Sequence, residues 1–244
     1  MGNKLNVVIW NEYRHEKTTP DIAALYPKGI HGAIAEFLGK RDDLNITLAA
    51  LDDPCQGLPD SLLENTDVLL WWGHMAHKEV DDALVEKIRQ RVYLGKMGFI
   101  ALHSGHHSKP FRAIVGTNGN LSWGRAQKEI IWNLLPAHPI AAGIPDRFVL
   151  DSEELYAEPF YIPQPDELIF GGWFEDGYIF RSGACYYRGA GKVFYLQPGD
   201  ERCLSYYNPY VQQVITNAVY WAKPNDIAYK ITDSCPHILT KADE

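Results

Sequence analysis

Several histidines of this sequence follow apolar segments and could bind a metal ion. His15, His74 and His103 each come after a different apolar run. Imidazole suits zinc, iron, copper or nickel, and a catalytic zinc takes three protein ligands and keeps one position open. We predict that these three histidines hold a divalent metal, expected to be zinc, with His107 or His138 as the substitute. The sequence leaves open which further residue joins His74 and His103: His15, His106, His107 or His138.

Acidic residues near these histidines could act as general acids or bases. Glu154 is the first choice for proton transfer and Glu12 is the second, while Asp200 and Glu201 complete the predicted catalytic set. A carboxylate can also orient a metal-bound histidine by accepting its second N–H. Glu12 and Glu16 lie close enough to His15 in the sequence to do this.

The sequence contains 7 Trp and 14 Tyr, a composition that suits a carbohydrate ligand. Flat aromatic rings pack against the C–H faces of pyranose rings, while amide, acidic and guanidinium groups bond the hydroxyls. The residues predicted to bind such a substrate are Trp10, Asn11, Trp123, Trp173 and Arg181. The alternative is that the tryptophans belong to the core, and that Arg181 pairs with Glu153 or Glu154.

These side chains need a framework that brings distant segments together, and the first half of the chain has the pattern of one. Strand-like and helix-like segments alternate there, in chain order 5–11, 30–40, 44–51, 67–73, 78–94, 97–104 and 109–115. This alternation is typical of a parallel sheet with helices on both faces. In a flavodoxin-like strand order, 5–11, 67–73 and 97–104 are neighbours, and a ligand crevice forms at their carboxyl ends.

The second half changes to strand-like segments separated by glycine and proline, at 129–135, 167–174, 178–187 and 191–197. The last two flank a turn at 188–191 and resemble a hairpin. An amphipathic helix at 208–221 follows. We therefore expect a three-layer α/β fold whose mostly parallel sheet has an antiparallel extension. A single domain spans 1–244, with its core at about 5–222 and a surface tail at 223–244.

The charge balance argues against several classes of partner. Lys and Arg number 23 against 31 Asp and Glu, a net charge of -8, which suits neither nucleic acid nor an anionic membrane. No apolar run approaches the ~20 residues that span a bilayer, and no signal-peptide pattern opens the chain, so we expect a cytoplasmic protein. No C-x-x-C pair occurs, and a thiol hydrolase would need Cys185 or Cys203 in the crevice. A homo-oligomer stays open.

The segment GFIALHSGHH combines a strand, a tight glycine turn and a helix, which is the arrangement of a nucleophile elbow. Downstream, VFYLQPGDE is similar to the strand end QFHPE of class I glutamine amidotransferases. That resemblance implies a related fold. His103 stands where those enzymes have their cysteine nucleophile, so we expect no glutaminase activity.

Longer strings resemble the ThuA-type trehalose-utilisation proteins: WNEYRHEK, ALYPKGIHGAIAE, DVLLWWGHMAH, IALHSGHHSK, HPIAAGI, EELYAEPF and WFEDGYIFRSG. The resemblance implies a flavodoxin-like, amidotransferase-like fold and a role in the catabolism of trehalose or related disaccharides at the 3-keto-sugar stage. Family members read PGHE where this chain reads PGDE at 198–201. The alternative function is that of a non-catalytic sugar-binding or regulatory protein on the same scaffold.

Overall fold

A computed structural model describes residues 4–224 of the chain. Within them one nine-stranded sheet has the strand order β2-β1-β3-β4-β9-β8-β7-β5-β6. Its parallel strands are β1 (Leu5–Asn11), β2 (Leu44–Ala50), β3 (Val68–Trp72), β4 (Gly98–Leu102) and β9 (Gly191–Leu196). Its antiparallel extension is formed by β5 (Ser122–Asn133), β6 (Arg147–Ala157), β7 (Glu167–Phe174) and β8 (Ile179–Arg188).

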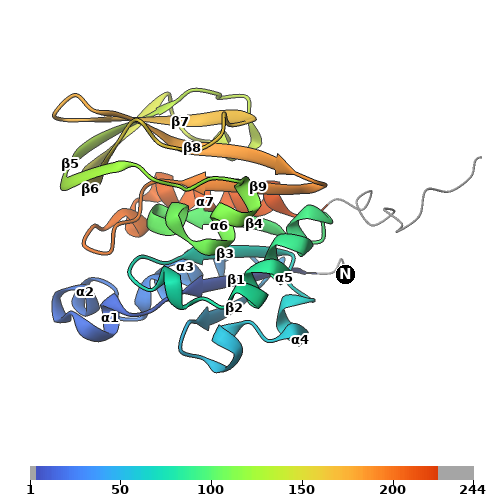
Figure 1. The fold of residues 1–244 in the computed structure, drawn as a ribbon. Helices are drawn as coiled ribbons and strands as arrows, with labels where there is room; N and C mark the ends of the chain where they lie inside the picture. The colour runs from blue at the N-terminus through green and yellow to red at the C-terminus, as the bar shows by residue number, and fades with distance from the viewer. Residues whose placement is uncertain (1–3, 225–244) are drawn as a thin grey trace, which may run out of the picture.

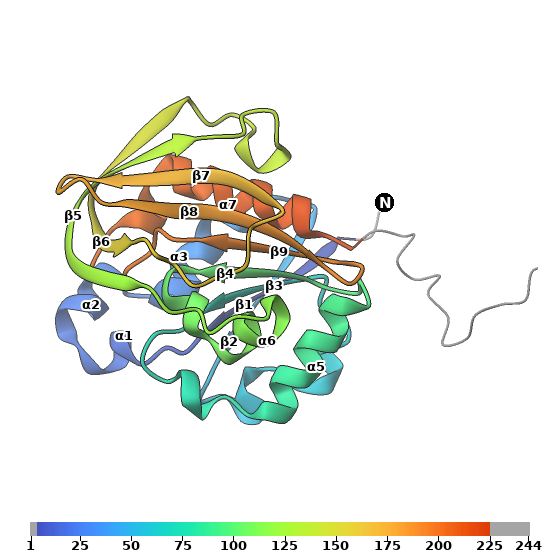
Figure 2. The same cartoon turned by 45° about the horizontal axis from the view of Figure 1, so that its top comes forward.

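Helices cover both faces of the parallel strands, as the alternation of segments predicts (Figures 1 and 2). The longer ones are α3 (Gly29–Leu38), α5 (Asp82–Tyr93), α6 (Lys109–Val115) and α7 (Pro209–Ala222). The short ones are α1 (His15–Thr18), α2 (Pro20–Leu25) and α4 (Asp60–Leu63). No helix in residues 4–224 is long and apolar enough to cross a membrane.

Neighbouring residues of each strand enter two separate cores, because side chains alternate across a sheet. Val7 and Trp72 pack with α3 and α7 on one face. Val8 and Trp71 pack with α5 and α6 on the other. The result is a three-layer structure in which both members of the Trp71–Trp72 pair are fully buried.

The predicted neighbourhood of the three histidine-bearing strands is confirmed. β3 lies between β1 and β4, and the three run parallel. Their carboxyl ends therefore meet at one edge of the sheet, where α1 and α2 also lie, at the left of Figure 1. The hairpin of β8 and β9 is also confirmed.

The sequence did not predict β6, the edge strand of the extension, and it predicted a shorter β5. β6 carries Asp151, Glu153 and Glu154 among its apolar residues, and several of its positions are exposed. An edge strand of this kind lacks the continuous apolar run by which buried strands are recognised. The predicted tail lies almost wholly outside the described residues.

Candidate functional site

The loop after β3 is held in place by Glu12, which lies just beyond the end of β1. Its two carboxylate oxygens accept backbone N–H groups from His74, Met75 and Ala76, at 2.6, 2.9 and 3.0 Å. Glu12 is 1% exposed, so these bonds satisfy a carboxylate that would otherwise be costly to bury. The prediction of Glu12 as an acid or base is therefore corrected: its oxygens anchor a loop.

His15, at the start of α1, meets His74, in the loop after β3. His15 Nε2 lies 2.7 Å from His74 Nδ1, and His15 Nδ1 lies 3.7 Å from an oxygen of Glu201. Burial lowers the pKa of His74, which favours its neutral form. A neutral imidazole is the form that binds metal.

Glu201 completes this group from the segment that follows β9. It is fully buried, yet among the described residues neither of its carboxylate oxygens has a hydrogen-bond donor. The basic side chains nearest to it are the His15 ring and Arg202, whose exposed guanidinium lies 3.1 Å away. Ligand atoms of His15, His74 and Glu201 lie within 4.8 Å of one another. A cation between them would compensate the buried carboxylate, so these three residues fit a divalent metal.

His103 lies at the tight turn between β4 and a short 3-10 helix (His103–His107), with a φ of 49°. Non-glycine residues rarely adopt this left-handed conformation, and it is typical of a nucleophile elbow. Its Nδ1 donates to the carbonyl of Gln197 at 2.9 Å, and its Nε2 donates to Glu154 at 3.2 Å. Tyr156 stacks on the ring and has its hydroxyl 3.2 Å from Nε2.

The surroundings of His103 keep its ring protonated. Burial alone would lower its pKa, but the bond to Glu154 and the charges of Glu153, Glu154 and Asp200 raise the pKa to about 10. An imidazolium donates from both nitrogens and has none free for a metal.

The predicted trio of His15, His74 and His103 is thus divided between two groups. His103 belongs with Glu154 and Asp200, whose ligand atoms lie within 4.8 Å of its own. The first two histidines have Glu201 as their third partner. His103 is separated from the other two histidines because Glu154 binds its ring. Glu154 lies on β6, a strand that was not predicted from the sequence.

A cavity of about 470 Å³ opens beside both groups. Glu154 faces it with 14% of its side chain exposed, and Trp123 stands at its border with 73% of its surface exposed. The lining residues are His74, His77, Ser104, His106, His107, Asn120, Leu121, Trp123, Glu154, Tyr156 and Arg202. The predicted positions of Trp123, Glu154 and His107 at the crevice agree with this arrangement.

Two further histidines line the cavity: His77, which was not predicted as a ligand, and His106, which the sequence left open. Burial, with the rings of His107 and His74 nearby, lowers the pKa of His77 to about 3. Burial lowers the pKa of His106 well below its usual range. Both rings are therefore neutral beside the protonated His103. Both histidines follow strand ends, which indicates their general position in the sequence. The sequence does not indicate which of the rings would face the cavity.

A buried carboxylate, Glu153, shapes the far side of the site. It accepts the N–H groups of Gly199 and Asp200 at 2.8 and 3.1 Å and the hydroxyl of Ser205. Gly199 has a φ of 139°, and a Cβ there would collide with the Tyr206 hydroxyl, so the turn requires glycine. These contacts fix the turn that presents Asp200 and Glu201.

Two of the predicted sugar-binding residues are structural. Trp10 is 1% exposed and stacks on Trp71 at a centroid distance of 3.7 Å. Asn11 is fully buried, and its amide contacts Glu16 at 2.7 Å and His31 at 3.1 Å. Neither lines the cavity. Trp10 and Asn11 point to opposite faces of β1, and both faces are covered by the rest of the protein. The prediction that they bind a sugar is therefore corrected.

Three other candidates lie away from this cavity. Trp173 and Arg181 line a separate hollow on the extension, and Arg181 pairs with Glu158 instead of either predicted glutamate. His138 lies beside Glu167 and Cys185, so the prediction of His138 as a substitute ligand at the crevice is corrected.

The thiol-hydrolase alternative finds no support in the two buried cysteines. Neither Cys185 nor Cys203 lines the cavity. Burial raises the pKa of both thiols, which disfavours the reactive thiolate.

Comparison with known proteins agrees with this architecture. The family model ThuA, described as trehalose utilisation, matches residues 6–222. A ThuA-like protein from Parabacteroides merdae has a similar structure, with a TM-score of 0.69 at 12% identity over 96% of this chain and 94% of that one. No curated protein matches the chain.

Two other solved structures share the fold. One is a glutamine amidotransferase from Thermotoga maritima, with a TM-score of 0.53 and 9% identity over 91% of this chain and 99% of that one. The other is a cytoplasmic protein from Salmonella typhimurium, with a TM-score of 0.60 and 12% identity over 91% of this chain and 100% of that one. The amidotransferase-like fold predicted from the sequence is confirmed.

Proposed function

The chain belongs to the ThuA family of trehalose-utilisation proteins, and from that premise we propose that it is a metal-dependent enzyme acting on a disaccharide or a 3-keto-sugar in carbohydrate catabolism. The observation that carries the proposal is the fully buried carboxylate of Glu201, which lies beside the rings of His15 and His74. Among the described residues it accepts no hydrogen bond, and its one ion pair with a guanidinium is to the exposed Arg202 at 3.1 Å. Two imidazoles and a carboxylate are a ligand set that zinc commonly takes in catalytic sites.

A divalent metal held by these residues would supply a Lewis acid for a carbonyl or water oxygen. The protein's own contribution to the chemistry is proton transfer. Glu154, next to the protonated His103, is partly exposed to the cavity and can accept a proton from the substrate. The Tyr156 hydroxyl lines the cavity 3.2 Å from the His103 ring and can donate a hydrogen bond to a substrate oxygen that gains negative charge, and the nearby imidazolium favours that charge.

A carbohydrate suits the cavity for a separate reason. A volume of about 470 Å³ falls in the range of small-molecule sites. Trp123 offers an exposed ring at its border, and Asn120 and Arg202 offer amide and guanidinium donors. We also propose that the protein works in the cytoplasm, as the similar Salmonella protein is described.

Activity on defined sugars tests the proposal. Metal-free full-length protein is assayed with trehalose, related disaccharides and their 3-keto forms, with and without added zinc, and the products are analysed. We expect turnover that requires metal and falls by about 100-fold or more in Glu154→Gln, because a general acid or base contributes on that scale. Glu175→Gln, an exposed carboxylate away from the cavity, serves as the control. Sugar binding without any turnover would favour the non-catalytic alternative.

A further inference from the structure

A second hollow lies on the outer face of the antiparallel extension. It has a volume of about 610 Å³ and is formed by side chains of β5, β7 and β8. None of its lining residues also lines the histidine cavity. Phe180, whose ring lies 5.6 Å from that of Tyr156, separates the two. Its size is that of a small-molecule site.

Two tryptophan rings form the walls of this hollow. Trp132 pairs with Gly171 across β5 and β7, and Ile130 pairs with Trp173, so these four residues share one face of the sheet. Each tryptophan is 41% exposed. Gly171 has no side chain, and Leu134 packs against it, so the floor of the hollow is apolar.

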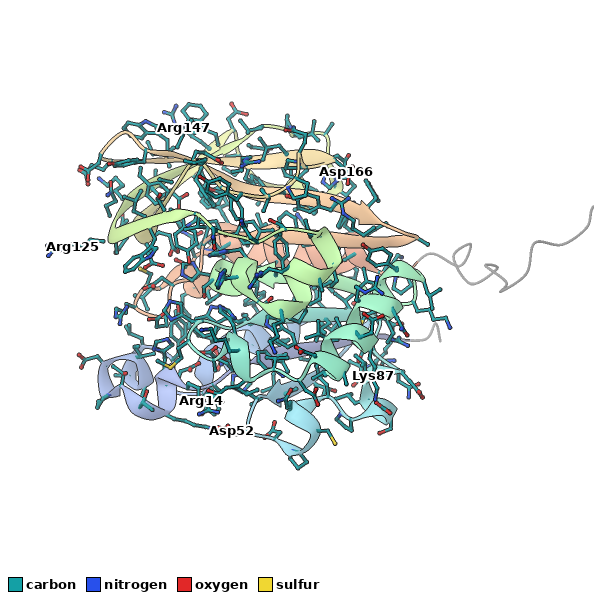
Figure 3. The ribbon with its side chains drawn as sticks, in the orientation of Figure 1. Arg14, Asp52, Lys87, Arg125, Arg147 and Asp166 are labelled. Carbon is teal, nitrogen blue, oxygen red and sulfur yellow. The ribbon has the colours of Figure 1, made fainter. Side chains whose placement is uncertain are left out.

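The ring of Trp132 is held from the side of β6. The guanidinium of Arg147, labelled at the top of Figure 3, lies 5.0 Å from its centroid. A cation over a tryptophan face is a favourable contact. The ring is thus positioned before any ligand arrives, which lowers the entropy cost of binding.

One edge of the hollow is polar. Arg181 binds Glu158 through two contacts, Nε to Oε1 at 2.7 Å and NH2 to Oε2 at 2.9 Å. The side chains of this ion pair are still 23% and 27% exposed. They can therefore offer both a donor and an acceptor to a ligand that lies against them.

We propose that this hollow is a second carbohydrate site, which binds a pyranose ring between Trp132 and Trp173 with its hydroxyl edge toward Arg181 and Glu158. A pyranose has a flat C–H face and a rim of hydroxyls, and it meets both requirements at once. A wholly apolar ligand would cover the ion pair without replacing its water. The site needs neither metal nor turnover, so it goes beyond the proposed function.

Fluorine NMR of the full-length protein labelled with 5-fluorotryptophan tests the proposal residue by residue. Single Trp→Phe variants assign the signals, and the probes are trehalose, maltose and cellobiose at millimolar concentrations. We expect at least one of these sugars to shift the Trp132 and Trp173 signals together and saturably. The signals of Trp10 and Trp71, which lie in the core, should stay fixed and serve as internal controls.

Variants separate this site from the histidine cavity. Trp173→Ala should weaken the Kd measured from the Trp132 signal by about tenfold, whereas Trp123→Ala should leave it unchanged. If none of the three sugars moves the two signals, or if Trp123→Ala abolishes the shifts, the proposal is wrong. It is also wrong if sedimentation shows a dimer that Trp173→Ala dissociates, because a second copy then covers this face. Absence of metal-dependent turnover, which would refute the proposed function, affects none of these results.

Discussion

His103 joins a strained backbone to a stabilised positive charge. Its left-handed conformation is of a kind that costs about 1–3 kcal/mol and persists where the surrounding structure holds it. The bonds to the Gln197 carbonyl and to Glu154 supply that support. The turn therefore carries a buried imidazolium whose two N–H groups are both bonded within the protein.

The charge on His103 depends on Glu154, and Glu154→Gln tests this directly. Removing the carboxylate should lower the pKa of His103 from about 10, since burial then dominates. The measurement is an NMR titration of the His103 ring protons. Glu167→Gln, which removes the partner of His138 instead, should leave the His103 titration unchanged. An equal pKa in the wild type and in Glu154→Gln would mean that other groups hold the proton.

The same ionisation makes stability depend on pH. The pKa of His103 is raised from about 6.5 when unfolded to about 10 when folded. Its stabilising contribution is therefore complete below about pH 6.5 and is lost as the pH rises through about 10. Between pH 7 and pH 10, urea unfolding should show the wild type losing ~1–3 kcal/mol more than His103→Gln. Parallel losses in both proteins would show that His103 does not bind this proton more tightly when folded.

At the scale of elements, the site depends on loops that buried carboxylates tie to strand ends. Glu12 joins the end of β1 to the loop after β3, and Glu153 joins β6 to the turn after β9. Periodicity locates strands and helices, so β1 to β4 and the three longest helices could be placed from the sequence within a few residues. It does not identify an acid that accepts backbone N–H groups, and Glu12 was therefore assigned to catalysis.

Glu12→Gln tests the anchoring role. An amide keeps one acceptor oxygen and turns its other group into a donor that faces backbone N–H groups, so the loop carrying His74 should loosen. We expect the unfolding free energy to fall by about 2–4 kcal/mol, together with a loss of zinc affinity. Glu79→Gln removes an exposed partner of Arg14 and should cost less than about 0.5 kcal/mol. Both are measured by urea unfolding, and comparable losses in the two variants would refute the anchoring role.

In the molecule as a whole, the order of the strands determines which parts of the site could be predicted from the sequence. The convergence of His15, His74 and His103 followed from the adjacency of β1, β3 and β4. The partners that divide these histidines come from far along the chain, Glu154 on the edge strand β6 and Glu201 after β9. Glu154 and Glu201 reach the histidines only because the antiparallel extension packs beside the parallel strands. No local sequence pattern specifies this packing. Trp173 and Arg181 were predicted to bind substrate with Trp123, but they line a different hollow, on the extension.

Zinc titration of the metal-free full-length protein, with a chelating competitor to set the free concentration, tests the central claim most directly. We expect one equivalent of tightly bound zinc in the wild type. Glu201→Gln and His74→Gln should each weaken binding by about 100-fold or more, because each removes a ligand. His107→Gln, which alters the same cavity outside the ligand group, should bind as the wild type does. Absence of stoichiometric zinc in the wild type, or unchanged affinity in Glu201→Gln, would show that His15, His74 and Glu201 do not form a zinc site.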